Sequence, residues 1–167
     1  MLPAYAADVL HVGEAGLGGL NAAVGVGALI GALTVATLSR SRYKGWQLAA
    51  GSFLFPLGLL SFAFSRSFSL SLVCLALVGF GFVSQNATSN TLVQGIVPDE
   101  LRGRVMGVYS LMFFGTTPFG SLLTGSLAQA FGPTIGVIVG AGVTLVFALI
   151  VFIFVPSLRR HDDKVTG

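Results

Sequence analysis

Residues 97–110, VPDELRGRVMGVYS, gather charges in a chain that otherwise avoids them. Four charged side chains lie within six positions: Asp99, Glu100, Arg102 and Arg104. The runs on either side, Ser67 to Pro98 and Val105 to Leu158, contain no charged residue. Because uncharged apolar runs of about 18 residues or more are typical of membrane spans, this stretch predicts a short polar turn that joins two of them.

The composition of the whole chain agrees with a membrane protein. Charged residues make up 9% and hydrophobic residues 54% of the 167 positions, whereas an ordinary soluble domain has about 25% charged residues. The net charge of +3 does not indicate nucleic-acid binding, because the basic residues lie between apolar runs, as they do beside membrane spans. The single cysteine, Cys74, lies inside an apolar run. The sequence therefore predicts an all-α, polytopic membrane protein.

Charges and helix breakers divide the chain into five expected spans. The longest uncharged run exceeds one helix and breaks at Phe131-Gly132-Pro133, since glycine and proline disfavour a continued helix. Each span is long enough to cross a hydrocarbon core of about 30 Å. The spans are expected at about 16–38, 46–64, 68–93, 105–130 and 134–155, so that 1–158 form one helical bundle and 159–167 a tail.

The basic residues predict how these spans are oriented. If the residues before the first span lie outside, eight lysines and arginines lie inside and only Arg66 lies outside. The opposite orientation would place eight of them outside and one inside. Loops rich in lysine and arginine stay in the cytoplasm. We therefore expect a multi-pass protein of the plasma (inner) membrane with a cytoplasmic C-terminus. The basic residues expected inside are Arg40, Arg42, Lys44, Arg102, Arg104, Arg159, Arg160 and Lys164.

Two long stretches make the order of features recognisable. They are LPAYAADVLHVGEAGLGGLNAAVGVGALIGAL at 2–33 and VQGIVPDELRGRVMGVYSLMFFGTTPFGSLLTGSLAQAFG at 93–132. The chain resembles the C-terminal half of a major facilitator superfamily transporter, and in particular the drug and siderophore exporters that include the enterobactin exporter. The second stretch is the more specific, because these residues recur there in order: Gln94, Pro98, Asp99, the Arg102-Gly103-Arg104 triplet and Gly107.

The resemblance implies a fold of two six-helix bundles, between which a substrate is carried by rocking one bundle against the other. On this interpretation residues 1–7 end the seventh span, and the five full spans are the eighth to the twelfth. The chain is then the C-terminal bundle with its first helix mostly missing. Its implied partners are the lipid bilayer, a small-molecule substrate and the missing N-terminal bundle, and its implied function is efflux of a drug or siderophore by alternating access. One departure is the connection LSRSRYKGW (38–46), which keeps the basic residues of a Gly-x-x-x-Asp-Arg pattern but lacks its aspartate.

The charged stretch is the first candidate functional segment. By analogy with the superfamily, a cytoplasmic gating loop is expected at Asp99, Glu100, Arg102, Gly103 and Arg104. Asp99 and Arg102 have the i,i+3 spacing of an ion pair on a helix, and Glu100 and Arg104 have the i,i+4 spacing. Contacts of this kind bias an equilibrium between conformations when they form in only one of them. The alternative is a topogenic loop, whose arginines only hold the orientation.

The second candidate is a polar stripe in SQNATSNTLVQ (84–94). Asn86, Asn90 and Gln94 recur every four residues and therefore lie on one face of a helix. Amides that face lipid are costly, so this face is expected to meet protein or a water-filled cavity. It then either lines the cytoplasmic half of the transport pathway or forms hydrogen bonds between helices.

Two further segments have helix-packing and hinge signatures. Ala23, Gly27 and Gly31 form a small-residue face, which packs either against the missing bundle as a sliding seam or within this half of the protein. Thr116 and Thr117 precede Pro118 in mid-span, where a proline kinks the helix and nearby hydroxyls can satisfy the freed backbone. This segment is expected to be either a hinge or a static kink.

Enzymatic classes have no support in the sequence. It contains no catalytic triad, nucleotide-binding motif or metal-ligand pair, so we expect neither catalysis nor a metal or cofactor. No ionisable Asp, Glu, Lys, Arg or His lies inside an expected span, and a coupling carboxylate of the kind that proton-driven carriers need would belong to the missing bundle. The rival to a transporter is a non-transporting truncated remnant or a membrane partner subunit. Transport requires a second bundle, so its presence or absence separates the two.

Overall fold

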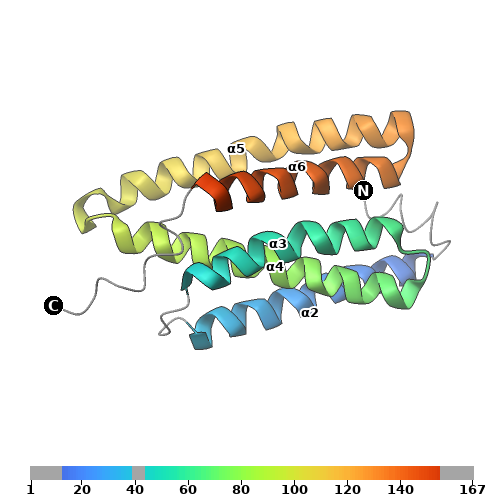
Figure 1. Ribbon diagram of the computed structural model, residues 1–167, viewed down its shortest axis with the longest axis horizontal. Coiled ribbons are helices and arrows are strands. Elements are labelled where there is room, and N and C mark those ends of the chain that lie inside the picture. The colour runs from blue at the N-terminus through green and yellow to red at the C-terminus, as the bar shows by residue number, and fades with distance from the viewer. Residues whose placement is uncertain (1–12, 39–43, 155–167) are drawn as a thin grey trace.

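The computed structural model describes residues 13–38 and 44–154, and all regular structure in these ranges is helical (Figure 1). The prediction of an all-α fold is therefore confirmed. Residues 1–7, the basic residues at 40 and 42, and the tail at 159–167 lie outside the described ranges. In chain order the helices are α2 (Glu14–Leu38), α3 (Lys44–Phe64), α4 (Phe68–Ile96), α5 (Asp99–Phe131) and α6 (Pro133–Phe154).

Within the described residues, three segments are long and apolar enough to cross a membrane by length and composition. They are Glu14–Thr37, Phe68–Ile96 and Pro133–Ile150, which confirms a polytopic membrane fold. α3 contributes a shorter apolar segment, Ala50–Phe64. α5 is the longest of the five helices and also the least hydrophobic. That α3 and α5 cross the bilayer as well stays a prediction.

The charged stretch is helical, and the connection between α4 and α5 consists of Val97 and Pro98 alone. The Leu101 N–H donates to the Pro98 carbonyl oxygen at 3.0 Å and closes the first turn of α5. Asp99 and Glu100 lie in this turn, where the positive end of the helix dipole favours carboxylates. α5 thus begins at Asp99, before the apolar span expected from Val105, and the ion pair expected at i,i+3 spacing lies in its first turns.

The break expected at Phe131-Gly132-Pro133 is a tight reversal between α5 and α6. Gly132 has a φ of +92°, a conformation that side chains with a Cβ rarely adopt. Its N–H donates to the Ala128 carbonyl oxygen at 2.9 Å. Pro133 then occupies the first position of α6, where its missing N–H costs no hydrogen bond.

The helices form a compact group of three beside a pair (Figure 1). α4 packs against both α2 and α3, α3 also contacts α6, and α6 contacts α5. A small core joins the first three helices and contains Leu20, Phe62, Cys74 and Leu75. α5, which is described over its whole length, has no buried residue and meets α4 only sparingly. The α4–α5 interface is therefore loosely packed.

Candidate functional site

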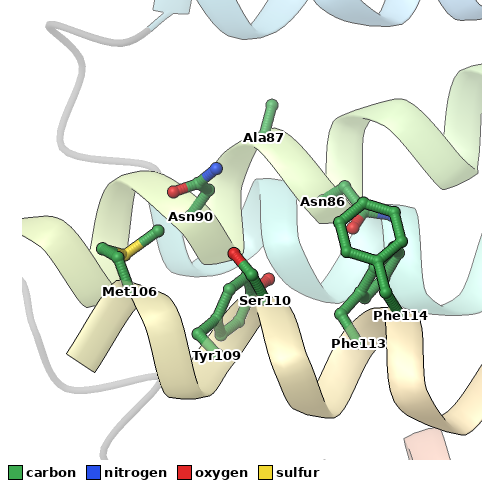
Figure 2. A pocket seen from close by; sticks show the side chains of 8 residues that line it. All are labelled: Asn86, Ala87, Asn90, Met106, Tyr109, Ser110, Phe113 and Phe114. Carbon is green, nitrogen blue, oxygen red and sulfur yellow. The ribbon is translucent and has the colours of Figure 1, made fainter. Parts of the chain in front are cut away.

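A pocket of about 240 Å³ lies between α4 and α5, in the halves of these helices that adjoin the Val97-Pro98 connection (Figure 2). Asn86, Ala87 and Asn90 of α4 form one wall. The other wall belongs to α5, and none of the eight lining side chains is charged. The α5 residues are Met106, Tyr109, Ser110, Phe113 and Phe114.

The α4 wall includes two of the three amides that the sequence placed on one helix face. Asn86 and Asn90 line the pocket directly. Gln94 follows one turn later and does not line it, but its Nε2 donates to Asn90 Oδ1 at 2.5 Å. At the other end, Asn86 Nδ2 donates to the Phe82 carbonyl oxygen at 3.0 Å. Both hydrogen bonds are made on the sides of Asn86 and Asn90 that face away from each other. The Asn86 oxygen and the Asn90 nitrogen therefore lie between the two asparagines.

The α5 wall is a stripe of aromatic and weakly polar side chains. Met106, Ser110 and Phe113 recur at helical spacing, as do Tyr109 and Phe113, so these side chains share one face of α5. The rings of Phe113 and Phe114 stand at 90° to each other with centroids 5.4 Å apart, the edge-to-face geometry that aromatic pairs favour. The pocket is consequently apolar and aromatic on the α5 side and amide-bearing on the α4 side.

Sequence reasoning missed the α5 wall. The stretch 105–130 has no charged residue and no strongly polar stripe, so nothing in its pattern separates a pathway face from a lipid face. The available signal was Tyr109, the first side chain after the charged stretch that joins an aromatic ring to a hydroxyl. Amphipathic residues of this kind concentrate where one end of the side chain is wet.

The charged segment lies next to this pocket. Arg102 is one helical turn before Met106, and its guanidinium pairs with Asp99 at 2.5 Å. The Arg102 side chain is 46% exposed and that of Asp99 is 86% exposed. Among the described residues this is the ion pair that the structure records, so the expected Glu100–Arg104 pair is absent from this conformation. Gly103 has open space around it.

The small-residue face of α2 packs inside this chain. A Cβ at Gly27 would overlap the Ala76 carbonyl oxygen of α4, and one at Gly31 would lie 2.8 Å from the Phe80 carbonyl oxygen. Ala23 packs against the core shared by α2, α3 and α4. In this structure α4 packs against the Gly27 and Gly31 face, as the alternative of packing within this half expects, and a role of this face as a sliding seam stays a prediction.

The Thr116-Thr117-Pro118 segment lies within a continuous α5, just beyond the pocket. The Thr116 hydroxyl donates to the Met112 carbonyl oxygen, and the Thr117 hydroxyl donates to the Phe113 carbonyl oxygen at 2.9 Å. Pro118 has no N–H to donate to the Phe114 carbonyl oxygen. The backbone of a residue that lines the pocket thus loses a helical hydrogen bond, which locally weakens α5.

Metal binding has no support in the described part of the chain. No group of three or more His, Cys, Asp and Glu side chains lies together there. The pocket offers only amide, hydroxyl, thioether and aromatic groups, a set that suits an organic molecule better than a divalent cation.

Comparison with known proteins adds relatives over nearly the whole chain. The family model described as transmembrane secretion effector, from the major facilitator superfamily, matches residues 1–166. The multidrug efflux pump Tap of Mycolicibacterium fortuitum is 30% identical over 162 residues, which are 97% of this chain and 39% of that protein. The enterobactin exporter EntS of Citrobacter koseri is 29% identical over 153 residues, or 90% of this chain and 36% of that protein. EntS of Shigella flexneri is 29% identical over 157 residues, or 92% of this chain and 38% of the relative.

The chain spans less than two fifths of the length of these relatives. No solved structure matches it.

Proposed function

The chain belongs to the transmembrane secretion effector family of the major facilitator superfamily, and we propose that it forms the C-terminal helical bundle of an exporter of small organic molecules. The names of its relatives, a multidrug efflux pump and enterobactin exporters, support the direction and the kind of cargo. The relatives are more than twice as long as the matched region, which supports a second bundle in the working transporter.

The observation that carries the proposal is the α4–α5 pocket. The amides of Asn86 and Asn90 would be costly against lipid, and both line a pocket faced by aromatic side chains. A mostly apolar cavity with a few polar groups is the usual form of a small-molecule site. We therefore assign this face of α4 to the transport pathway, with Gln94 holding Asn90 in place through its hydrogen bond.

Alternating access would open and close the pocket between a rigid part and a looser part. α4 is held between α2 and α3 by close backbone contacts at glycines, including Gly27 against Ala76 and Gly81 against Phe55. α5 lacks buried residues and contacts α4 sparingly. Movement of α5 against α4 would change the pocket at little cost in packing between these two helices, and the Asp99–Arg102 pair at the start of α5 would bias that movement.

The proposed setting is the plasma membrane, with the α4–α5 connection and the C-terminus in the cytoplasm. The arginines at 102 and 104 support this orientation through the positive-inside rule. The pocket adjoins the same connection, so in this orientation it would receive substrate from the cytoplasmic side.

The test is transport by the complete gene product, including whatever reading frame precedes Met1. The gene would be expressed in bacteria that lack their own efflux pumps, and cellular accumulation would be measured for neutral, cationic and anionic aromatic compounds and a catecholate siderophore. We expect lower accumulation of at least one compound, and an efflux rate reduced about tenfold by Asn86→Ala or Asn90→Ala.

Asn21→Ala is the matched control. Asn21 is an exposed asparagine of α2 whose Nδ2 donates to the Leu17 carbonyl oxygen of its own helix, as Asn86 donates within α4. It should leave efflux unchanged. A closed upstream frame without a partner gene, together with unchanged accumulation of every compound, would instead support a non-transporting remnant or partner subunit.

A further inference from the structure

The two pocket asparagines present different chemical groups to a ligand. The Asn86 nitrogen is engaged by the Phe82 carbonyl, and the Asn90 oxygen is engaged by Gln94. No described residue donates to Asn86 Oδ1, and none accepts from Asn90 Nδ2. The pocket therefore offers an unused acceptor atom, Asn86 Oδ1, and an unused donor atom, Asn90 Nδ2, one helical turn apart on the same face of α4. In Figure 2 the Asn90 nitrogen points to the Asn86 side of the residue and its oxygen points away.

The spacing of these groups suits a single hydroxyl. Side chains four residues apart on a helix have Cβ atoms about 5–6 Å apart, so one oxygen atom placed between the two amides can reach both. A ligand hydroxyl would donate to Asn86 Oδ1 and accept from Asn90 Nδ2. A ligand without a donor would leave the Asn86 oxygen unpaired in a partly dehydrated site, which costs binding free energy.

The opposite wall and the size of the pocket indicate what carries that hydroxyl. Phe113, Phe114 and Tyr109 supply aromatic surface across from the amides, and rings favour stacked or edge-to-face contacts with such surface. The volume of about 240 Å³ exceeds the ~150 Å³ cavity that holds benzene and falls below the ~300–1,000 Å³ typical of drug-sized ligands. It therefore fits one ring system rather than a whole large molecule.

The electrostatics of the pocket disfavour a charged ring, because no lining side chain supplies an opposite charge. No lining side chain is charged. The cation that precedes the α5 wall on the same face, Arg102, is already paired with Asp99. An anion in this pocket would lose hydration without gaining a cationic partner, which is unfavourable.

From these observations, and resting on the proposed export function, we propose that the α4–α5 pocket is a subsite for an uncharged hydroxylated aromatic ring, with Asn86 as hydrogen-bond acceptor and Asn90 as donor. Larger substrates would place one such ring in the pocket and extend beyond it. Gln94 is a positioning residue, because it acts on the ligand only by fixing the Asn90 amide.

The test measures occupancy of the pocket independently of transport. In the complete protein in nanodiscs, with Cys74→Ala as background, a thiol would be introduced by Ser110→Cys and its rate of reaction with N-ethylmaleimide measured. The probes are 1-naphthol, 1-methoxynaphthalene, naphthalene and 1-naphthalenesulfonate, which share one ring system and differ in hydrogen bonding and charge. Gly103→Cys, an open position two turns earlier on α5, reports any nonspecific effect of the probes.

We expect 1-naphthol to slow labelling of the Ser110→Cys variant about fivefold and to leave the Gly103→Cys variant unaffected. The methoxy compound, which loses the hydrogen bond to Asn86, should protect at about fivefold higher concentration, the usual effect of losing one hydrogen bond. Naphthalene, which loses both hydrogen bonds, should need a still higher concentration, and the sulfonate should not protect. Adding Asn86→Leu should abolish the advantage of 1-naphthol over the methoxy compound.

Equal protection by all four probes, or protection by none, would overturn the subsite. Efflux without protection would overturn it while leaving the exporter proposal intact. Protection without efflux would keep the ring subsite and count against the exporter.

Discussion

Gly27 of α2 lies against Ala76 of α4 so closely that a Cβ at position 27 would overlap the Ala76 carbonyl oxygen. The contact is repeated in the opposite sense by Gly79 of α4 against the Val24 carbonyl oxygen. Close backbone approach at small residues is a main source of helix association in membranes, where apolar side chains gain little by leaving lipid. These glycines therefore hold α2 and α4 together as one unit.

Gly27→Ala should destabilise this unit by about 1–3 kcal/mol, because the added methyl group has no room and the helices must separate. Gly25→Ala, two residues earlier on the same helix and facing open space, should have no such effect, since alanine favours helix more than glycine does. Thermal denaturation of the purified protein in detergent, followed by loss of the monodisperse species, would measure both. Equal melting temperatures for the two variants would mean that α2 and α4 do not pack in this way.

Arg102→Gln should slow transport several-fold while changing stability little. The Asp99–Arg102 pair is largely exposed, and exposed pairs contribute about 0–1 kcal/mol, so an effect on rate would arise from a conformation in which these charges are more buried. The paired reversal Asp99→Arg with Arg102→Asp should recover part of the rate. If the single variant instead changes the orientation of the chain in the membrane, the topogenic interpretation of this segment is correct.

Pro118→Ala should raise the melting temperature and lower the transport rate. Alanine restores the N–H that can donate to the Phe114 carbonyl oxygen, so α5 becomes stiffer beside the pocket. Pro56→Ala in α3 is the comparison, because Pro56 is buried in the packed part of the bundle and its replacement should leave the transport rate unchanged. A Pro118→Ala protein that transports normally would identify a static kink.

The proposed orientation places the α3–α4 and α4–α5 connections on opposite sides of the membrane. Ser67 and Gly103 are exposed positions at these two connections. In the Cys74→Ala background, the Ser67→Cys variant should react with a membrane-impermeant maleimide in intact cells, and the Gly103→Cys variant only in inside-out vesicles. Reaction of both variants from the same side would show that α4 does not cross the bilayer.

Much of the helical organisation follows from the order of residues along the chain. Uncharged runs and the breaker triplet at Phe131-Gly132-Pro133 predict where helices lie, because helix formation in an apolar chain is a local matter of backbone hydrogen bonding. The same local reasoning predicted the Asp99–Arg102 contact and the shared face of Asn86 and Asn90, since both depend only on the period of a helix. α5 begins at Asp99, before the apolar span expected from Val105, because a helix can continue through charged residues outside the apolar core.

The tertiary structure decided which faces meet. The sequence marked Gly27 as part of a packing face, yet only the fold shows that α4 fills it. Likewise, the stripe at Asn86 and Asn90 was visible in the sequence, whereas its aromatic partners at Tyr109 and Phe113 were not. The reason is that lipid and protein interior are both apolar. The hydrophobic pattern of a membrane helix such as α5 therefore does not distinguish the face that contacts other helices from the face that contacts lipid. Local chemistry along the chain determined the helices and the polar face of α4, and three-dimensional packing determined the pocket that this face lines.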